Sequence, residues 1–298
     1  MKKTTGTALV AASLLMTTLA GCGSNSLTST STAAPAASST APSSVNAALA
    51  AKLPASIKTA GVIQIGTDAT YKPNEYMNGN DVIGFDVDLF DAVAADLGVK
   101  TKWNPAAFDS ILTGVAAKKY DVGVSSFTIN AKRMETVTFV SYANVGTQWV
   151  TLAGNPKAID PKNVCGKTIA VQTATVQDDE MTAAQTACGA NAINLLKYTG
   201  QDEVNNALSI GKADAMLADY PIAMNAVQTS AGKMAALGEQ YGAAPYGYAM
   251  TKDNQGLAEA ISGALGDLKK SGKYDEILNK YGIKAAAVSS FAINPTVS

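Results

Sequence analysis

The stretches KKYDVGV (Lys118–Val124) and GKADAML (Gly211–Leu217) decide the fold, because they are two versions of one junction. In each, basic residues at the end of a helix-like segment lead directly into a short apolar run that is typical of a buried strand. The elements expected before both junctions follow the same order of strand, helix, strand and helix. This repetition predicts an α/β protein with two lobes, each with a mostly parallel sheet flanked by helices.

The segments around the first junction support this interpretation. VIQIGTD (62–68) and TKWN (101–104) are typical of short strands. GFDVDLFDAVAADLG (84–98) predicts an amphipathic helix, because large apolar side chains recur every four residues, at Phe85, Leu89, Val93 and Leu97.

The second half repeats the pattern, and the chain then returns to the first lobe. Its strands are expected in KTIAVQ (167–172), AINLLKY (192–198) and ADAMLAD (213–219). We expect two crossings between the lobes, near 142–148 and 242–248, and a closing helix with one apolar face. The expected division is signal peptide 1–21, tether 22–50, first lobe 51–145 and 244–284, second lobe 146–243 and a loosely held tail 285–298.

The amino terminus has the features of an export signal. MKK is followed by ALVAASLLMTTLAG (8–21), an apolar run too short to span a membrane, and the run ends at Cys22. LAGC (19–22) resembles the bacterial lipobox, in which the cysteine is lipid-modified; the alternative is an ordinary cysteine near a cleaved signal. The following Ser/Thr/Ala/Pro tract predicts a flexible tether. We therefore expect an exported protein, periplasmic or lipid-anchored to the outer face of the cell membrane.

The composition excludes several functions. The 298 residues contain 23 Lys and Arg, 24 Asp and Glu and no His, so a nucleic-acid partner, a zinc site and a histidine-based hydrolase are not favoured. Cys165 and Cys188 remain in the exported part, where two cysteines usually form a disulfide. A metal site needs more ligands than two thiols. We expect a disulfide, no metal and no cofactor.

Four loops follow the predicted strands, and ligands of such sheets bind at the carboxyl ends of strands. Arg133 offers a fork that fits a carboxylate, the helix start at Thr175 favours an anion, and Asp219 suits an ammonium group. Tyr71 and Phe108 could form apolar walls. Each residue also has a structural interpretation: Arg133 as a solvated surface residue, Thr175 and Asp219 as helix caps, and both aromatic residues as core packing. Their convergence favours a site for a zwitterion.

Six segments in order resemble the polar amino-acid-binding proteins of ATP-binding-cassette (ABC) importers, over about residues 57–282. The segments are IGTDATYKPNEY (65–76), GFDVDLFDAVAADLGV (84–99), ILTGVAAKKYDVGVSSFTINAKRMETVTF (111–139), GKTIAVQTATVQ (166–177), ALSIGKADAMLADYPIA (207–223) and LKKSGKYDEILNKYG (268–282). The resemblance implies a two-lobed clamp, joined by two strands, that closes on its ligand and docks a membrane permease.

The resemblance also implies roles for single residues. Arg133 would bind the ligand α-carboxylate with help from Ser126, Thr128 and Thr175, and Asp219 would bind the α-ammonium. The space for the ligand side chain would be lined by Asp68, Tyr71, Phe108 and Gln172. Asn74 stands where the family commonly has an aromatic residue, which predicts a more polar pocket edge. Asp68 favours a basic or amide side chain, as in arginine or glutamine, over an acidic one.

Two other functions share this fold. An exported dehydratase would need an acid or base near its substrate, and Asp68 and Glu75 are the candidates. A sensory module would bind the same ligand for a membrane receptor. The complete set of zwitterion-binding groups favours a binding protein over an enzyme. We expect a monomer, with a polar amino acid and a permease as its partners.

Overall fold

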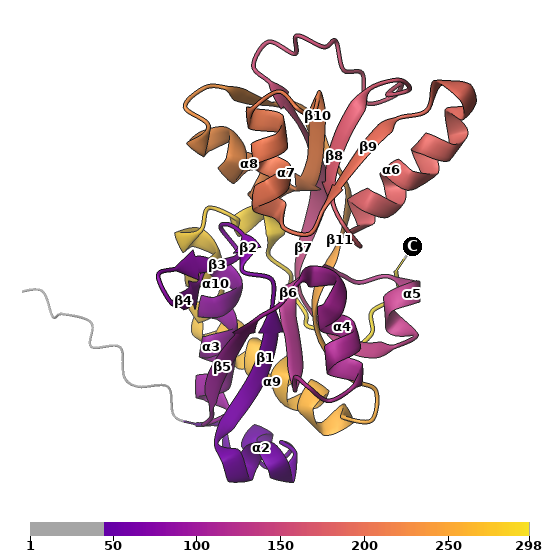
Figure 1. The fold of residues 1–298 in the computed structure, drawn as a ribbon. Helices are drawn as coiled ribbons and strands as arrows, with labels where there is room; N and C mark the ends of the chain where they lie inside the picture. Colours follow the sequence, from indigo (N-terminus) through magenta and orange to yellow (C-terminus); the bar gives the residue numbers. More distant parts are fainter. Residues whose placement is uncertain (1–44, 298) are drawn as a thin grey trace, which may run out of the picture. The chain divides into compact units, whose positions relative to one another are not determined.

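The computed structural model describes residues 45–297 (Figure 1). The expected signal peptide (1–21), Cys22 and most of the expected tether lie outside the described residues. The first lobe begins with α2 (Ala55–Ala60) and β1 (Val62–Thr67) and continues with a small sheet of β2 (Thr70–Tyr71), β3 (Glu75–Asn78) and β4 (Asp81–Ile83). Its remaining elements before the crossing are α3 (Phe85–Asp96), β5 (Lys100–Pro105), α4 (Phe108–Ala116), β6 (Val122–Thr128) and α5 (Ala131–Met134).

Two long strands connect the lobes. β7 (Val137–Leu152) leads into the second lobe and β11 (Met234–Thr251) leads back, and the two pair antiparallel along most of their length. Between them lie β8 (Thr168–Gln172), α6 (Val176–Ala187), β9 (Asn194–Tyr198), α7 (Gln201–Ser209), β10 (Ala215–Asp219) and α8 (Tyr220–Thr229). The chain ends with α9 (Gln255–Ser271) and α10 (Lys273–Lys280). Both predicted crossings fall inside β7 and β11.

One sheet of eight strands runs through both lobes in the order β5-β1-β6-β11-β7-β10-β8-β9. At one end β5, β1 and β6 are parallel, and at the other end β10, β8 and β9 are parallel. The long strands β11 and β7 run antiparallel to their neighbours β6 and β10. The predicted α/β fold, with a mostly parallel sheet in each lobe and two connecting strands, is confirmed.

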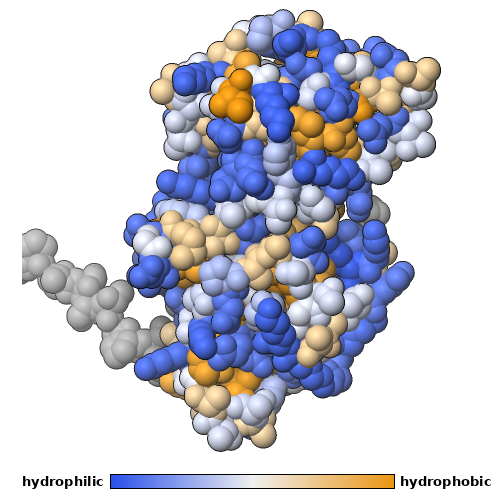
Figure 2. Space-filling model, viewed as in Figure 1, coloured by the Kyte–Doolittle hydropathy of each residue, from blue (hydrophilic) through white to orange (hydrophobic). Residues whose placement is uncertain are grey.

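Helices cover both faces of the sheet in each lobe. In the first lobe, α3, α9 and α10 contribute to one apolar core and α4 to another on the opposite face. In the second lobe, α7 and α8 share one core, and α6 packs in the other. The predicted apolar face of α3 is buried, with Phe85, Leu89, Val93 and Leu97 each at most 1% exposed. Figure 2 shows one face of the molecule, on which hydrophilic residues are widespread and hydrophobic residues form separate patches.

The amino-terminal boundary of the folded part differs from the prediction. Residues 47–50, which we expected in the tether, form a short helix, α1 (Ala47–Ala50). Asn46 caps this helix, and its amide also donates to Asp267 on α9 at 2.7 Å. Leu49 packs against Gly263 of the same helix. These contacts involve single polar and apolar residues in a tract of low complexity, so composition alone did not indicate them.

The carboxyl-terminal tail also differs from the prediction, because residues 287–297 pack on the first lobe. Phe291 is 8% exposed and contacts the Tyr274 ring edge to face, at 5.2 Å between centroids. Ile293 forms an antiparallel bridge with Val140 of β7. Beside it, the Asn294 N–H donates to the Phe139 carbonyl at 2.9 Å, and the Asn294 side-chain oxygen accepts from the Phe139 N–H at 2.8 Å. The tail therefore covers the edge of β7 in the first lobe.

The second lobe contains a disulfide between Cys165 and Cys188, whose Cα atoms are 5.4 Å apart. It ties the turn before β8 to the end of α6. Among residues 45–297, no helix combines the length and the apolar character that crossing a bilayer requires.

Candidate functional site

The candidate site lies where strands of both lobes end. Asp68 follows β1 and Thr128 ends β6, whereas Gln172 ends β8 and Asp219 ends β10. All four strands direct their carboxyl ends toward the junction of the lobes, as expected for parallel sheets.

Seven of the nine predicted ligand-binding residues surround one small cavity at this junction. The cavity is lined by Tyr71, Phe108, Ser126, Thr128, Arg133, Thr175, Val176, Gln177 and Asp219. Its volume is about 10 Å³, which holds roughly one water molecule. The lobes are thus closed on each other, and an amino acid reaches these groups only when they separate.

Arg133 contacts both lobes. Asn130 caps the single turn of α5 through the Arg133 N–H at 2.8 Å, and this orients the side chain. Its guanidinium donates to the Thr128 carbonyl at 2.6 Å and to the Ala174 carbonyl of the second lobe at 2.9 Å. Burial lowers the pKa of Arg133, and the carboxylates of Asp219 and Asp179 oppose this shift. No carboxylate within residues 45–297 forms an ion pair with Arg133, so the guanidinium has charge to offer an anion.

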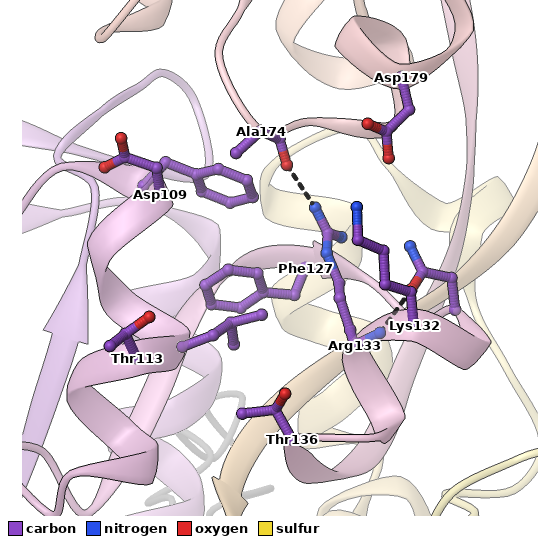
Figure 3. A pocket seen from close by; sticks show the side chains of 11 residues that line it. Asp109, Thr113, Phe127, Lys132, Arg133, Thr136, Ala174 and Asp179 are labelled. Carbon is purple, nitrogen blue, oxygen red and sulfur yellow. Dashed lines mark hydrogen bonds between the residues drawn. The ribbon is translucent and has the colours of Figure 1, made fainter.

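A second, larger cavity of about 240 Å³ shares Arg133 and Phe108 with the first. In Figure 3 the Arg133 side chain passes the Phe127 ring and reaches toward the Ala174 carbonyl, with Lys132 beside it and Asp179 above. The guanidinium carbon lies 5.5 Å from the Phe108 ring centroid and 5.7 Å from that of Phe127. The two rings stack at 4.8 Å between centroids. The aromatic pair therefore supports the cation from one side.

Asp219 is the anion of the cavity. It is 5% exposed and accepts hydrogen bonds from Tyr71 at 2.9 Å and Tyr246 at 2.6 Å on one oxygen, and from Gln177 at 2.7 Å on the other. Burial raises its pKa, and these donors and the Arg133 charge counteract the increase. Asp219 precedes α8, but its side chain makes no capping bond. The carboxylate faces the lobe junction, where an ammonium group would neutralise it.

Asp68 and Gln172 do not line the small cavity and instead bond to each other across the lobes. Asp68 also accepts from the Thr70 hydroxyl at 2.9 Å and from the Thr70 N–H at 3.1 Å. Burial raises the pKa of Asp68 to about 6, against these donors, and Asp202 adds to the increase. Asp68 opens onto a cavity of about 520 Å³ that also contacts Asp202 and Glu203 of α7. A cation would be favoured there.

Two expectations are modified by the structure. Thr175 caps α6, because its hydroxyl accepts from the Asp178 N–H at 3.1 Å and donates to the Gln172 carbonyl at 2.7 Å, so only its backbone N–H remains for an anion. Asn74 is not at the pocket edge. It is fully buried below Ser126 and donates to the Ser126 hydroxyl at 2.8 Å.

Tyr246 and Gln177 were missed by the sequence analysis. Tyr246 lies on the returning strand β11, opposite Thr128 of β6 and Ala143 of β7. Gln177 lies in the first turn of α6 and is the last residue of the quoted segment GKTIAVQTATVQ (166–177). Both side chains donate hydrogen bonds to Asp219. The register of β11 turns Tyr246 toward Asp219, and the position at which α6 starts does the same for Gln177, and neither could be known from the sequence.

The sequence of residues 63–284 matches the profile of the bacterial extracellular solute-binding proteins, family 3. Over 249 residues the chain is 32% identical to an arginine-binding protein of Corynebacterium glutamicum, with 82% of each chain covered. Over 229 residues it is 30% identical to a lysine/arginine/ornithine-binding periplasmic protein of Escherichia coli, which covers 74% of this chain and 86% of that protein.

Solved structures show the same fold. An ancestral arginine-binding protein bound to arginine superimposes with a TM-score of 0.71 at 31% identity, over 74% of this chain and 98% of its own. An ancestral amino-acid-binding protein described as a precursor of cyclohexadienyl dehydratase superimposes with a TM-score of 0.68 at 27% identity, over 76% and 97% of the two chains.

Proposed function

Because the chain belongs to the bacterial extracellular solute-binding proteins of family 3, we propose that it captures an amino acid between its lobes for an ABC importer. The observation that carries this proposal is the pair Arg133 and Asp219, which line the same cavity from different lobes. Neither belongs to an ion pair within residues 45–297. An α-carboxylate and an α-ammonium group supply the two missing counter-charges. A zwitterion therefore contacts both lobes and stabilises the closed form.

The ligand side chain would point toward Asp68 and Gln172. Asp68 is a buried carboxylate without a lysine or arginine partner in the described part of the chain, and Asp202 and Glu203 line the same opening. A guanidinium or ammonium group would offset the cost of burying the Asp68 charge. Relatives named for binding arginine support the same choice. The proposed ligand is arginine or another basic amino acid.

The alternative of a dehydratase is less favoured. Glu75, one of its two candidate groups, is fully buried and does not line the cavity, so it cannot touch a substrate there. The other, Asp68, accepts hydrogen bonds from both lobes. The lipid anchor at Cys22 is proposed from the resemblance of LAGC (19–22) to the lipobox, and the docking of a permease from the resemblance to the importer family. A monomeric state completes the proposal.

Binding is tested by thermal unfolding of residues 45–298 with each common amino acid. A ligand at about 1,000 times its dissociation constant adds roughly 4 kcal/mol to stability. We expect the largest shift with arginine or lysine. Arg133→Ala and Asp219→Ala should each weaken binding by at least about 30-fold, since removing one partner of a buried charge pair costs roughly 2–5 kcal/mol.

Lys132→Ala is the matched control, because Lys132 neighbours Arg133 but lines only the larger cavity. Its affinity should stay within about threefold of wild type, as expected for an exposed charge. Unchanged affinity in either test variant would remove that residue from the site. Conversion of the bound amino acid, followed by NMR, would favour the enzyme alternative.

A further inference from the structure

Ser126 separates the cavity from an enclosed polar cluster beneath it. Its N–H and hydroxyl lie 3.0 and 3.2 Å from one oxygen of Asp86, and Asn74 donates to its hydroxyl at 2.8 Å. Its backbone has a φ of 49°, a left-handed conformation that is uncommon for residues other than glycine. Such a conformation persists only where surrounding contacts fix it. The cluster beneath Ser126 therefore controls the part of the cavity that Ser126 lines.

The cluster contains two carboxyl groups, Glu75 and Asp86, and both side chains are fully buried. None of the eight ion pairs among residues 45–297 includes either. The titratable groups that face the two carboxyls from neighbouring elements are all acidic: Asp68, Tyr71, Tyr142 and Tyr248. Two negative charges in this enclosure would be costly.

The hydrogen-bond inventory shows where a shared proton fits. One oxygen of Asp86 accepts from Tyr142 at 2.8 Å and from Ser126, while its other oxygen, Oδ1, is buried without a partner. Oε1 of Glu75 faces the Ser125 hydroxyl at 3.2 Å, and that hydroxyl already accepts from the Asp68 N–H at 2.9 Å. Ser125 therefore donates to Oε1. Oε2 lies 3.3 Å from the Ser126 hydroxyl, whose single proton also faces Asp86 at 3.2 Å. When that hydroxyl donates to Asp86, Oε2 is left without a donor and can carry a proton. Both carboxyl groups approach the same Ser126 hydroxyl, which places them close together, and each affects the pKa of the other.

We propose that Glu75 keeps its proton at neutral pH and uses it to donate a hydrogen bond to Oδ1 of Asp86. This hydrogen bond positions Ser126 for ligand binding. Glu75 is then a positioning residue that acts through Asp86 and Ser126 without touching the ligand. The ligand-binding half of this inference rests on the proposed function, whereas the location of the proton does not.

The direction of the pKa shifts agrees with this assignment. Burial, and then the Asp86 charge, raise the pKa of Glu75 well above its usual value. Burial also raises the pKa of Asp86, to about 6, but hydrogen bonds from Tyr142, Glu75 and Ser126 hold it down. Glu75 is accordingly the member that retains the proton.

The sign of the pH dependence follows from linkage. A carboxyl whose pKa is higher in the folded state stabilises the fold fully below its unfolded pKa, and this contribution is lost as the pH rises through the folded pKa. Loss of the Glu75 proton places two anions beneath Ser126. Both the stability of the ligand-free protein and the ligand affinity should therefore decrease toward alkaline pH.

The test compares wild type with Glu75→Gln and Glu75→Ala, by urea unfolding without ligand and by calorimetric titration with arginine, from about pH 6 to 9. Glutamine keeps an acceptor for Ser125 and a permanent donor for Asp86. We expect Glu75→Gln to bind within about threefold of wild type at pH 6 and to become relatively more stable and tighter as the pH rises. Glu75→Ala should bind at least about tenfold more weakly throughout, because Asp86 loses its donor.

Deprotonation of the ligand itself changes the affinity of all variants equally. The ratio of each variant's affinity to that of wild type therefore reports the effect of Glu75 alone. Parallel pH profiles for wild type and Glu75→Gln, in both unfolding and binding, would overturn the proposal. So would Glu75→Gln binding as weakly as Glu75→Ala, which would mean that a carboxylate is required. If no amino acid binds wild type, the proposed function fails, and the unfolding profiles still decide where the proton lies.

Discussion

Asp68 combines burial with a raised pKa, and this gives a prediction for a single residue. A basic ligand side chain requires the ionised carboxylate, whereas the pKa of ligand-free Asp68 is about 6. The affinity for arginine should therefore decrease as the pH falls below about 6, by up to tenfold per unit. Asp68→Asn should abolish this dependence and weaken arginine binding at pH 7.5 by roughly 30-fold or more. Calorimetric titration across pH measures both effects.

Two comparisons make this prediction specific. Glutamine, which carries no side-chain charge, should lose much less affinity in Asp68→Asn than arginine does. Asp202→Asn, on the same opening but exposed, should change arginine affinity by only a few-fold. Equal losses for arginine and glutamine would show that Asp68 does not contact the side chain.

The two charged residues that line the small cavity, Arg133 and Asp219, could be proposed from residue type and position. Arg133 follows a buried strand and Asp219 ends one, and a charge there has few roles besides ligand binding or capping. Thr175 was ambiguous from the sequence, because a hydroxyl before a helix suits both roles, and the structure uses it as a cap. Asn74 was misplaced, since only the tertiary structure shows that it points below Ser126 and not into the pocket.

The tail of residues 287–297 adds one bridge and several hydrogen bonds to β7, which predicts a role in stability. A chain that ends at Ala286 should lose about 2–5 kcal/mol of unfolding free energy, from the burial of Phe291 and the bonds at Phe139 and Ser141. Urea unfolding measures the loss. Asn294→Ala, which removes one side-chain acceptor and places alanine at a left-handed φ of 46°, should cost about 1–2 kcal/mol. An unchanged unfolding midpoint after truncation would show that the tail is held too weakly to contribute.

Elements with strong periodicity were predictable, and elements defined by tertiary contacts were not. The strands and helices of the two repeated halves were indicated by apolar spacing, as in α3 and β10. The small sheet β2-β3-β4, the helix α1 and the bridge at Ile293 have short sequences without a repeated pattern. Their conformations depend on partners distant in the sequence, so only the folded chain defines them.

The two lobes contact each other through bonds that differ in their relation to the ligand. The hydrogen bond from Tyr71 to Asp219 joins two residues of the small cavity, and the bond to the Ala174 carbonyl engages the Arg133 guanidinium of the same cavity. A ligand must therefore replace or share both bonds. The Gln201 N–H donates across the junction to the Thr70 hydroxyl at 3.0 Å, outside the cavity. This last bond stabilises the closed form and lies outside the small cavity that Arg133 and Asp219 line.

Thr70→Val therefore tests closure of the whole molecule. It keeps the shape of the side chain and removes the hydroxyl that accepts from the Gln201 N–H across the lobes and donates to Asp68 within the first lobe. Because only the Gln201 bond joins the lobes, the change in closure reflects that bond. Losing it costs roughly 0.5–1.5 kcal/mol, so ligand affinity should fall by about two- to tenfold, mainly through faster dissociation. Stopped-flow binding and small-angle scattering measure this, and the ligand-free variant should be more extended than wild type. Thr101→Val is the matched control, because the Thr101 hydroxyl bonds Asp91 within the first lobe, at 2.6 Å. Equal effects of the two substitutions would contradict the role of Thr70.

Because the closed cavity of about 10 Å³ excludes an amino acid, the lobes must open before the ligand binds. A variant that opens more readily should therefore bind the ligand no more slowly than wild type.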